Sequence, residues 1–206
     1  MTEERKNFSF VNITLVAVNI LYFLFLFTQG NVGDSDFAVQ HGAMYGPWIV
    51  AQKKWWMLFS AMFYHFSIQH LANNMITLFF LGNRVEQLMG HVKYGVMYFG
   101  AGLCGNIVSY LWAAFRGEAV VSGGASGAVF GVIGALLWIV IRHRGRVGDI
   151  TLKRLMLMLA LSLYYGLADT GVDNPAHIGG MLGGFVLAVL LYRKRSRESQ
   201  RYSMQA

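Results

Sequence analysis

Ser126 is a serine whose surroundings suit nucleophilic chemistry. It lies in the segment Ser-Gly-Gly-Ala-Ser-Gly over 122–127, at the start of a long apolar stretch. Glycine on both sides lets the backbone turn sharply, lets another helix approach and leaves the hydroxyl uncovered. A helix that begins here also supplies free N–H groups, which suit a developing oxyanion. A small-residue packing motif continued by Gly127 and Gly131 is the alternative interpretation, and this segment alone does not decide between the two.

His177 begins a second apolar stretch, and Gly180 and Gly184 follow it on the same helical face. A glycine stripe beside a histidine indicates that another backbone approaches closely, and the glycine-rich segment after Ser126 is the natural partner. If the two stripes meet, His177 can take the proton of Ser126, which is the arrangement of nucleophilic catalysis. Asp169 and Asp173 precede the histidine in a loop, but their spacing assigns neither to it. The sequence therefore predicts a Ser–His dyad and not a triad.

His70 and Asn74 are polar residues inside a third apolar stretch. They are four residues apart and share one face of a helix, which must look into the bundle or into water. Both can donate a hydrogen bond while uncharged, so they suit an oxyanion hole together with the N–H of Ser126. An interhelical hydrogen-bonding pair is the alternative interpretation. His65 and Asn73 are weaker candidates for a functional site. His65 lies near the expected membrane interface, and Asn73 points about 100° away from Asn74 around the helix.

The composition indicates that membrane helices position these residues. Of the 206 residues, 55% are hydrophobic and only 13% are charged, against about 25% charged in a soluble domain. The deficit lies in long uncharged runs, which predicts a polytopic membrane protein. The net charge is +7, and the arginines and lysines behind it flank these runs. Their placement indicates membrane topology and not a nucleic-acid partner. Cys104 is the single cysteine, so no intrachain disulfide is possible.

Six stretches meet or approach the roughly 20 apolar residues that a bilayer crossing needs. They cover 11–28, 57–81 with a polar first third, 92–115, 124–141, 152–167 and 176–192. The predicted fold is all-α: one domain built as a bundle of six transmembrane helices, the fifth of them short. A cleaved signal peptide is the alternative for 11–28. An anchor is favoured, because the stretch is long and aromatic-rich and no Ala-x-Ala site follows before Asn31.

The basic residues predict the orientation of this bundle. With six spans, both termini lie on one side with the second–third and fourth–fifth loops. This side holds 14 of the 17 basic residues: Arg5, Lys6, Arg84, Lys93, Arg142, Arg144, Arg146, Lys153, Arg154, Arg193, Lys194, Arg195, Arg197 and Arg201. The positive-inside rule puts that side in the cytoplasm. We expect both termini and a basic tail over 193–206 there, where the tail touches anionic lipid, and a bacterial inner membrane as the location.

The longest loop, about 29–56, lies on the non-cytoplasmic side of this map. It contains Trp48 and Trp55, and tryptophan is enriched at the headgroup level, so much of the loop is expected in the interface. A connecting loop with an aromatic belt and a functional loop remain equally supported.

The chain resembles the rhomboid intramembrane serine proteases, of the bacterial six-helix core type. Three motifs carry the resemblance: His65-x4-His70-x3-Asn74, Gly-Ala-Ser-Gly over 124–127, and Ala-His-x2-Gly-x3-Gly over 176–184. Gly82, Glu86 and Gly90 also fit the family pattern. Each motif alone is weak, but their order on the second, fourth and sixth stretches is very specific.

The resemblance implies roles for individual residues. Ser126 is the implied nucleophile and His177 the general base and acid, while His70, Asn74 and the Ser126 N–H form the oxyanion hole. Phe130 stands where the family commonly has a tyrosine stacked on the histidine, so stacking is expected without the hydroxyl. Met57 stands where the family often has arginine after tryptophan, which bears on the stability of the first loop.

The implied substrates are transmembrane segments of other proteins, cleaved at small residues after local unwinding, and the lipid bilayer is the other implied partner. Neither a cofactor nor a metal is expected: no His-Glu-x-x-His motif occurs, and Asp169 has no partner aspartate in a span. A transporter would be expected to show internal repeats, which are not evident. A catalytically inactive rhomboid-like protein that binds membrane clients is the main alternative. The natural substrate and oligomeric state are not assigned by the sequence.

Overall fold

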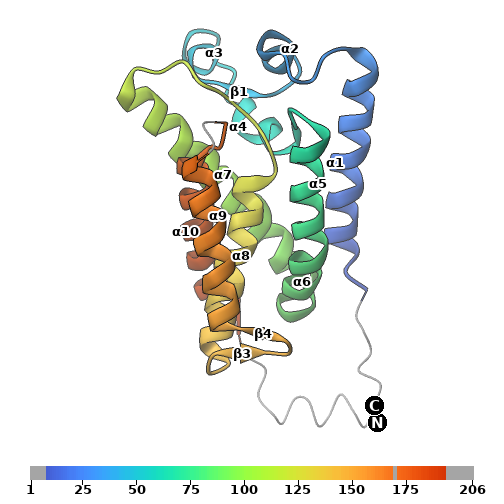
Figure 1. Cartoon of the computed structure of the whole chain (residues 1–206), viewed down its shortest axis with the longest axis vertical. Helices are drawn as coiled ribbons and strands as arrows, with labels where there is room; N and C mark the ends of the chain where they lie inside the picture. The colour runs from blue at the N-terminus through green and yellow to red at the C-terminus, as the bar shows by residue number, and fades with distance from the viewer. Residues whose placement is uncertain (1–7, 169–170, 194–206) are drawn as a thin grey trace.

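The chain folds into a bundle of helices that run side by side, with small elements gathered at its two ends (Figure 1). The computed structural model describes residues 8–168 and 171–193. The long helices are α1 (Phe10–Gln29), α5 (Ile68–Thr77), α7 (His91–Arg116), α8 (Ser126–Arg142), α9 (Leu152–Ala168) and α10 (Asn174–Leu191). The predicted tail from residue 194 onward, Arg5, Lys6 and Asp169 lie outside the described residues.

Short elements connect these helices. The first loop holds α2 (Ser35–Gln40), β1 (Met44–Tyr45) and α3 (Gly46–Ala51), and the chain then enters α4 (Met57–Ser60) and the 3₁₀ turn η1 (Ala61–Phe63). The π-helical turn η2 (Leu78–Gly82) and α6 (Asn83–Met89) extend α5. The part of the chain that the structure describes also contains two antiparallel strand pairs: β1 with β2 (Val121–Ser122), and β3 (Arg146–Val147) with β4 (Ile150–Thr151).

Within the described residues, three helices are long and apolar enough to cross a bilayer: α1, α7 and α10. The helix α8 is apolar but has 17 residues, and it lies at the centre, where most of its side chains are buried. By contrast, α1 exposes Leu21, Phe25 and Phe27 along its length. Such apolar surface is unusual in a soluble protein and suits contact with lipid.

The helix expected over 57–81 differs in the structure. Residues 57–67 form α4, η1 and an extended link at Tyr64, and α5 begins only at Ile68. The hydroxyl of Ser67 accepts a hydrogen bond from the N–H of His70 at 3.1 Å, an N-cap that fixes this start. The helix then continues beyond residue 81, through η2 and α6 to Met89. His70 and Asn74 consequently lie in the first two turns of α5.

The predicted meeting of two glycine stripes is present between α8 and α10. A Cβ atom on Gly180 would overlap the carbonyl of Gly127, and one on Gly184 would overlap the carbonyl of Gly131. Only glycine permits backbones to lie this close. The contact fixes α10 directly against the first turns of α8.

Met57 stands at the position of the family arginine and is fully buried. It packs in a small core of its own with Val39, Met44, Ile49 and Ala61. Met57 therefore contributes to the first loop through apolar packing.

Glu86 ties α1 to the rest of the bundle. Its carboxylate accepts hydrogen bonds from the backbone N–H groups of Val11 and Asn12 at 3.1 and 2.7 Å, and it pairs with His91 at 2.5 Å. A buried carboxylate thus satisfies free N–H groups at the start of α1, where the helix dipole also favours negative charge.

We expect Glu86→Ala to lower the free energy of unfolding in detergent by about 2–4 kcal/mol, because two buried N–H groups lose a charged acceptor. Glu86→Gln keeps the shape and one acceptor oxygen, so an intermediate loss is expected. Denaturant titration of the purified variants measures both. Equal stability of Glu86→Ala and the unmodified protein would contradict this assignment.

Candidate active site

A cavity of about 1160 Å³ brings the predicted site residues together. Ser126, His177, His70, Asn74 and Phe130 all line it. They come from α5, α8 and α10, which are separated by tens of residues in the chain. Their convergence in one hollow is the central geometric feature of the molecule.

Ser126 is the first residue of α8, and the chain that leads to it is held on several sides. The N–H of Gly124 donates to the carbonyl of Ala61 at 2.8 Å, and β2 pairs with β1 two residues earlier. Because the first N–H groups of a helix have no partner within it, the N–H of Ser126 is available to an oxygen in the cavity. Ser126 therefore brings both a hydroxyl and a backbone N–H donor to the start of α8.

Gly124 has a φ of +138°, a backbone conformation that side-chain-bearing residues rarely adopt. A Cβ atom there would lie 2.8 Å from Cε1 and Nε2 of His70, and 3.7 Å from Oγ of Ser126. The imidazole of His70 therefore packs over the glycine, next to the serine hydroxyl. Only glycine allows these two side chains to share this space.

His177 lies in the first turn of α10, and its ring is fixed by Phe130. The two rings are stacked, with centroids 4.1 Å apart and planes inclined by 10°. The helix start is set by Asp173, whose carboxylate accepts from the N–H of Ala176, and by Pro175. Nδ1 of His177 is buried and, within the described part of the chain, has no hydrogen-bond partner.

Ser126 and His177 are neighbours through their backbones. A Cβ atom on Gly127 would lie 3.6 Å from the carbonyl oxygen of Ala176, so the residue after the serine touches the residue before the histidine. Among the hydrogen bonds of the described residues, none joins Ser126 to His177. Nucleophile–base bonds are often long without substrate and tighten in the reacting complex.

Asn74 is buried, and its side-chain N–H donates to the carbonyl of His70 at 3.1 Å. A second amide hydrogen remains for another acceptor, since an asparagine amide carries two. Asn74 and His70 therefore present donors on the face of α5 that lines the cavity.

His65 has a larger part in the site than its sequence position suggested. It is 1% exposed, so its ring is buried within the protein. Its Nδ1 contacts the carbonyl of Phe63 at 3.2 Å, and its Nε2 accepts from the N–H of Ala125 at 3.4 Å. The ring thus holds the residue immediately before Ser126. In the sequence, the one feature that could have indicated this role is that His65 lies in the same motif as His70.

Asp173 is the second residue whose part the sequence left open. Within the described hydrogen bonds, its carboxylate binds Ser109, Ser122 and the N–H of Ala176, and not the ring of His177. Among the described residues, no carboxylate is hydrogen-bonded to the ring of His177, and Asp169 lies outside them.

Comparison with known proteins identifies the family. Residues 52–194 match the model of the Rhomboid domain, and the chain belongs to the rhomboid family. Together with its apolar helices, this membership makes it an integral membrane protein.

Relatives agree with this assignment. Rhomboid protease GluP of Bacillus subtilis (strain 168) is 33% identical over 176 residues, covering 85% of this chain and 34% of that protein. RHOMBOID-like protein 7 of Arabidopsis thaliana is 36% identical over 156 residues, covering 73% and 47%. YdcA of Bacillus subtilis is 30% identical over 148 residues, covering 72% and 73%. The chain thus spans a third to a half of the length of the first two relatives.

Proposed function

We propose that this protein is a serine endopeptidase that cleaves transmembrane segments of other membrane proteins with a Ser126–His177 dyad. One observation carries the proposal: the hydroxyl at the start of α8, the stacked imidazole of α10 and the donors of α5 all line one cavity. A nucleophile, a base and oxyanion donors are the groups that acyl transfer requires.

The proposed reaction has two steps. Oγ of Ser126 attacks the carbonyl carbon of the scissile peptide while His177 takes the hydroxyl proton, and the N–H of Ser126 with Asn74 and His70 stabilises the oxyanion. His177 then gives the proton to the leaving amine, and an acyl-enzyme remains. His177 then takes a proton from a water molecule that attacks the ester carbonyl, and it returns this proton to Oγ of Ser126 as the ester bond breaks. Phe130 keeps the imidazole in one plane during both transfers.

The membrane arrangement is part of the same proposal. Six spans with both termini in the cytoplasm of a bacterial cell would place the cavity toward the non-cytoplasmic face, where water can enter. The polar residues Ser67 and Gln69, at the start of α5, line that cavity and suit a hydrated opening. A substrate helix must unwind to expose its peptide bond, so segments containing glycine or other helix-weakening residues are the expected class.

The direct test is cleavage of reporter transmembrane peptides by the protein in liposomes. Peptides that differ only in a central glycine pair against a leucine pair should be cleaved at clearly different rates, the glycine form faster. Absence of cleavage for every peptide by a folded protein would favour the inactive, client-binding alternative.

Asn74→Ala tests the oxyanion donors separately from the dyad. Loss of one donor should lower kcat by about 10²–10³-fold and leave KM nearly unchanged, because the donor acts on charge that develops in the transition state. Steady-state kinetics in liposomes measure kcat and KM separately. An increase in KM alone would instead assign Asn74 to substrate binding.

A further inference from the structure

The carboxylate of Asp173 joins three separate elements beside the candidate active site. Its Oδ2 accepts hydrogen bonds from the hydroxyls of Ser109 on α7 and Ser122 in β2, each at 2.5 Å. Its Oδ1 accepts from the N–H of Ala176 at 3.0 Å, and its backbone carbonyl accepts from the N–H of His177 at 3.1 Å. One side chain therefore links α7, the segment before α8, and the start of α10.

The spacing of these bonds relates them to the dyad. Ser122 lies four residues before Ser126, and Asp173 lies four residues before His177. The hydrogen bond between Ser122 and Asp173 thus ties the chain that delivers the serine to the helix that carries the histidine. The glycine contact between α8 and α10 sets the separation of these two helices. The hydrogen bond between Ser122 and Asp173 in addition restrains the chain that leads into Ser126.

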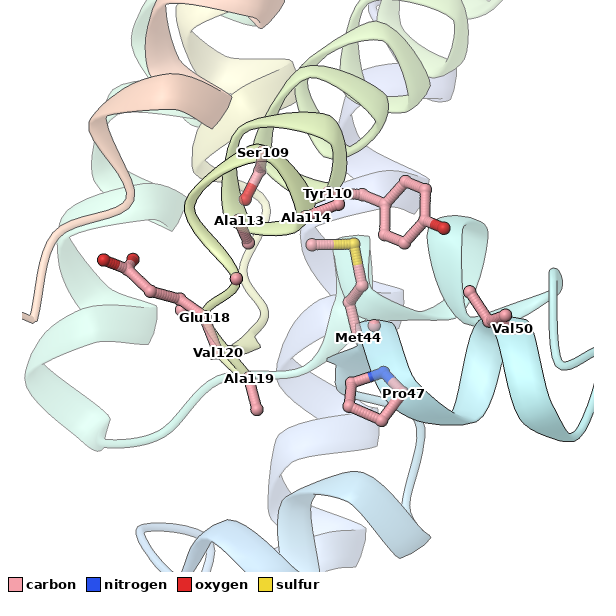
Figure 2. Close-up of a pocket in the computed structure, with 12 residues that line it drawn as sticks. Met44, Pro47, Val50, Ser109, Tyr110, Ala113, Ala114, Glu118, Ala119 and Val120 are labelled. Carbon is pink, nitrogen blue, oxygen red and sulfur yellow. The ribbon is translucent and has the colours of Figure 1, made fainter.

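Both serines are almost fully buried, with Ser109 5% and Ser122 8% exposed. Ser109 lines the large cavity and also a smaller one of about 270 Å³. Figure 2 shows its hydroxyl on α7 above the smaller cavity, across from Met44 and Pro47 of the first loop. Since Met44 pairs with Ser122 in the β1–β2 ladder, the first loop is connected to the same carboxylate.

We infer that Asp173 is a positioning residue for the reaction, which acts through Ser109 and Ser122 to hold Ser126 and His177 in register. The inference rests on the proposed function. An ionised carboxylate is suited to this task because it accepts several hydrogen bonds at once and strengthens each of them. A displacement of about 1 Å at a reacting group can lower a rate on the order of 10²-fold.

Capping of α10 is the other task of Asp173, and one substitution separates the two. Serine is as good an N-cap as aspartate, but its shorter side chain cannot reach Ser109 and Ser122. Asp173→Ser should therefore keep the helix start and lose the links. Asp34→Ser is the matched control, because Asp34 caps α2 through the N–H of Phe37 and is exposed in the first loop.

The experiment measures the rate constant of labelling by a fluorophosphonate probe, kcat and KM for a cleaved reporter peptide, and the unfolding midpoint. Asp173→Ser should reduce the labelling rate and kcat on the order of 10²-fold, with KM close to that of Asp34→Ser. Its unfolding midpoint should fall below that of Asp34→Ser, because two buried hydroxyls lose their acceptor. The double variant Ser109→Ala/Ser122→Ala should show the same reduction of the labelling rate and of kcat. The triple variant that also carries Asp173→Ser should be no slower than the double variant. Asp173→Asn, which preserves length and planarity, should recover part of the rate.

Two results would overturn the inference alone: an unchanged labelling rate in Asp173→Ser, or a loss of rate in Asp173→Ser that the double variant Ser109→Ala/Ser122→Ala does not share. An unmodified protein that neither labels nor cleaves would instead overturn the proposed function, and with it this inference.

Discussion

Ser126→Ala is expected to abolish cleavage of reporter peptides in liposomes while the protein remains folded. Removal of the nucleophile leaves no group in the dyad that can form the acyl-enzyme, and losses on the order of 10⁴-fold or more are typical. The fold should tolerate the change, because α8 packs on α10 through Gly127 and Gly131 and not through the serine hydroxyl. Initial rates and the unfolding midpoint, measured on the same preparation, test both parts.

His177→Ala should cause a loss of similar size, and the double variant should be no worse than either single one, since the two residues act as a unit. Ser35→Ala is the matched control: Ser35 is exposed in α2 of the first loop. Cleavage by Ser126→Ala at a tenth of the unmodified rate or more would mean that another group is the nucleophile.

Gly180→Ala should lower the stability of the fold and the rate of cleavage together. The added methyl would overlap the carbonyl of Gly127, the residue that follows the nucleophile, so the two helices must separate. Overpacking of this kind costs about 1–3 kcal/mol or more. Separation would also displace Ser126 from His177 and lower kcat.

Gly95→Ala is the control for that variant, because a Cβ atom at Gly95 in α7 would meet only Val11, at an ordinary 3.8 Å. Alanine is the better helix former, so the control should be as stable as the unmodified protein or slightly more so. Denaturant titration in detergent compares the pair. If Gly180→Ala matched Gly95→Ala in stability, the close contact between α8 and α10 would be contradicted.

Helical spacing and runs of apolar residues predicted several features of this structure. The face shared by His177, Gly180 and Gly184 follows from helical spacing alone, and the structure places that stripe on Gly127 and Gly131. The helix over α7 agrees with the apolar stretch at 92–115 to within one residue at each end. The stacking of Phe130 on His177 was expected from the family resemblance and is present.

Other features depend on contacts between distant residues, and the sequence did not specify them. The break before α5 arises from a serine cap and an extended link that hydropathy does not detect. Burial of His65 depends on the backbone of Ala125, 60 residues away. The hydrogen bond of Asp173 with Ser109 spans 64 residues, so no spacing rule could assign it.

The Ser126–His177 dyad is tested most directly by labelling the purified protein with a fluorophosphonate and mapping the modified residue. The probe reacts with an activated serine and needs no knowledge of the substrate. We expect a single modified serine, Ser126, with labelling lost in Ser126→Ala and in His177→Ala. A folded protein that stays unlabelled, or one labelled equally well in His177→Ala, would contradict a Ser126–His177 dyad.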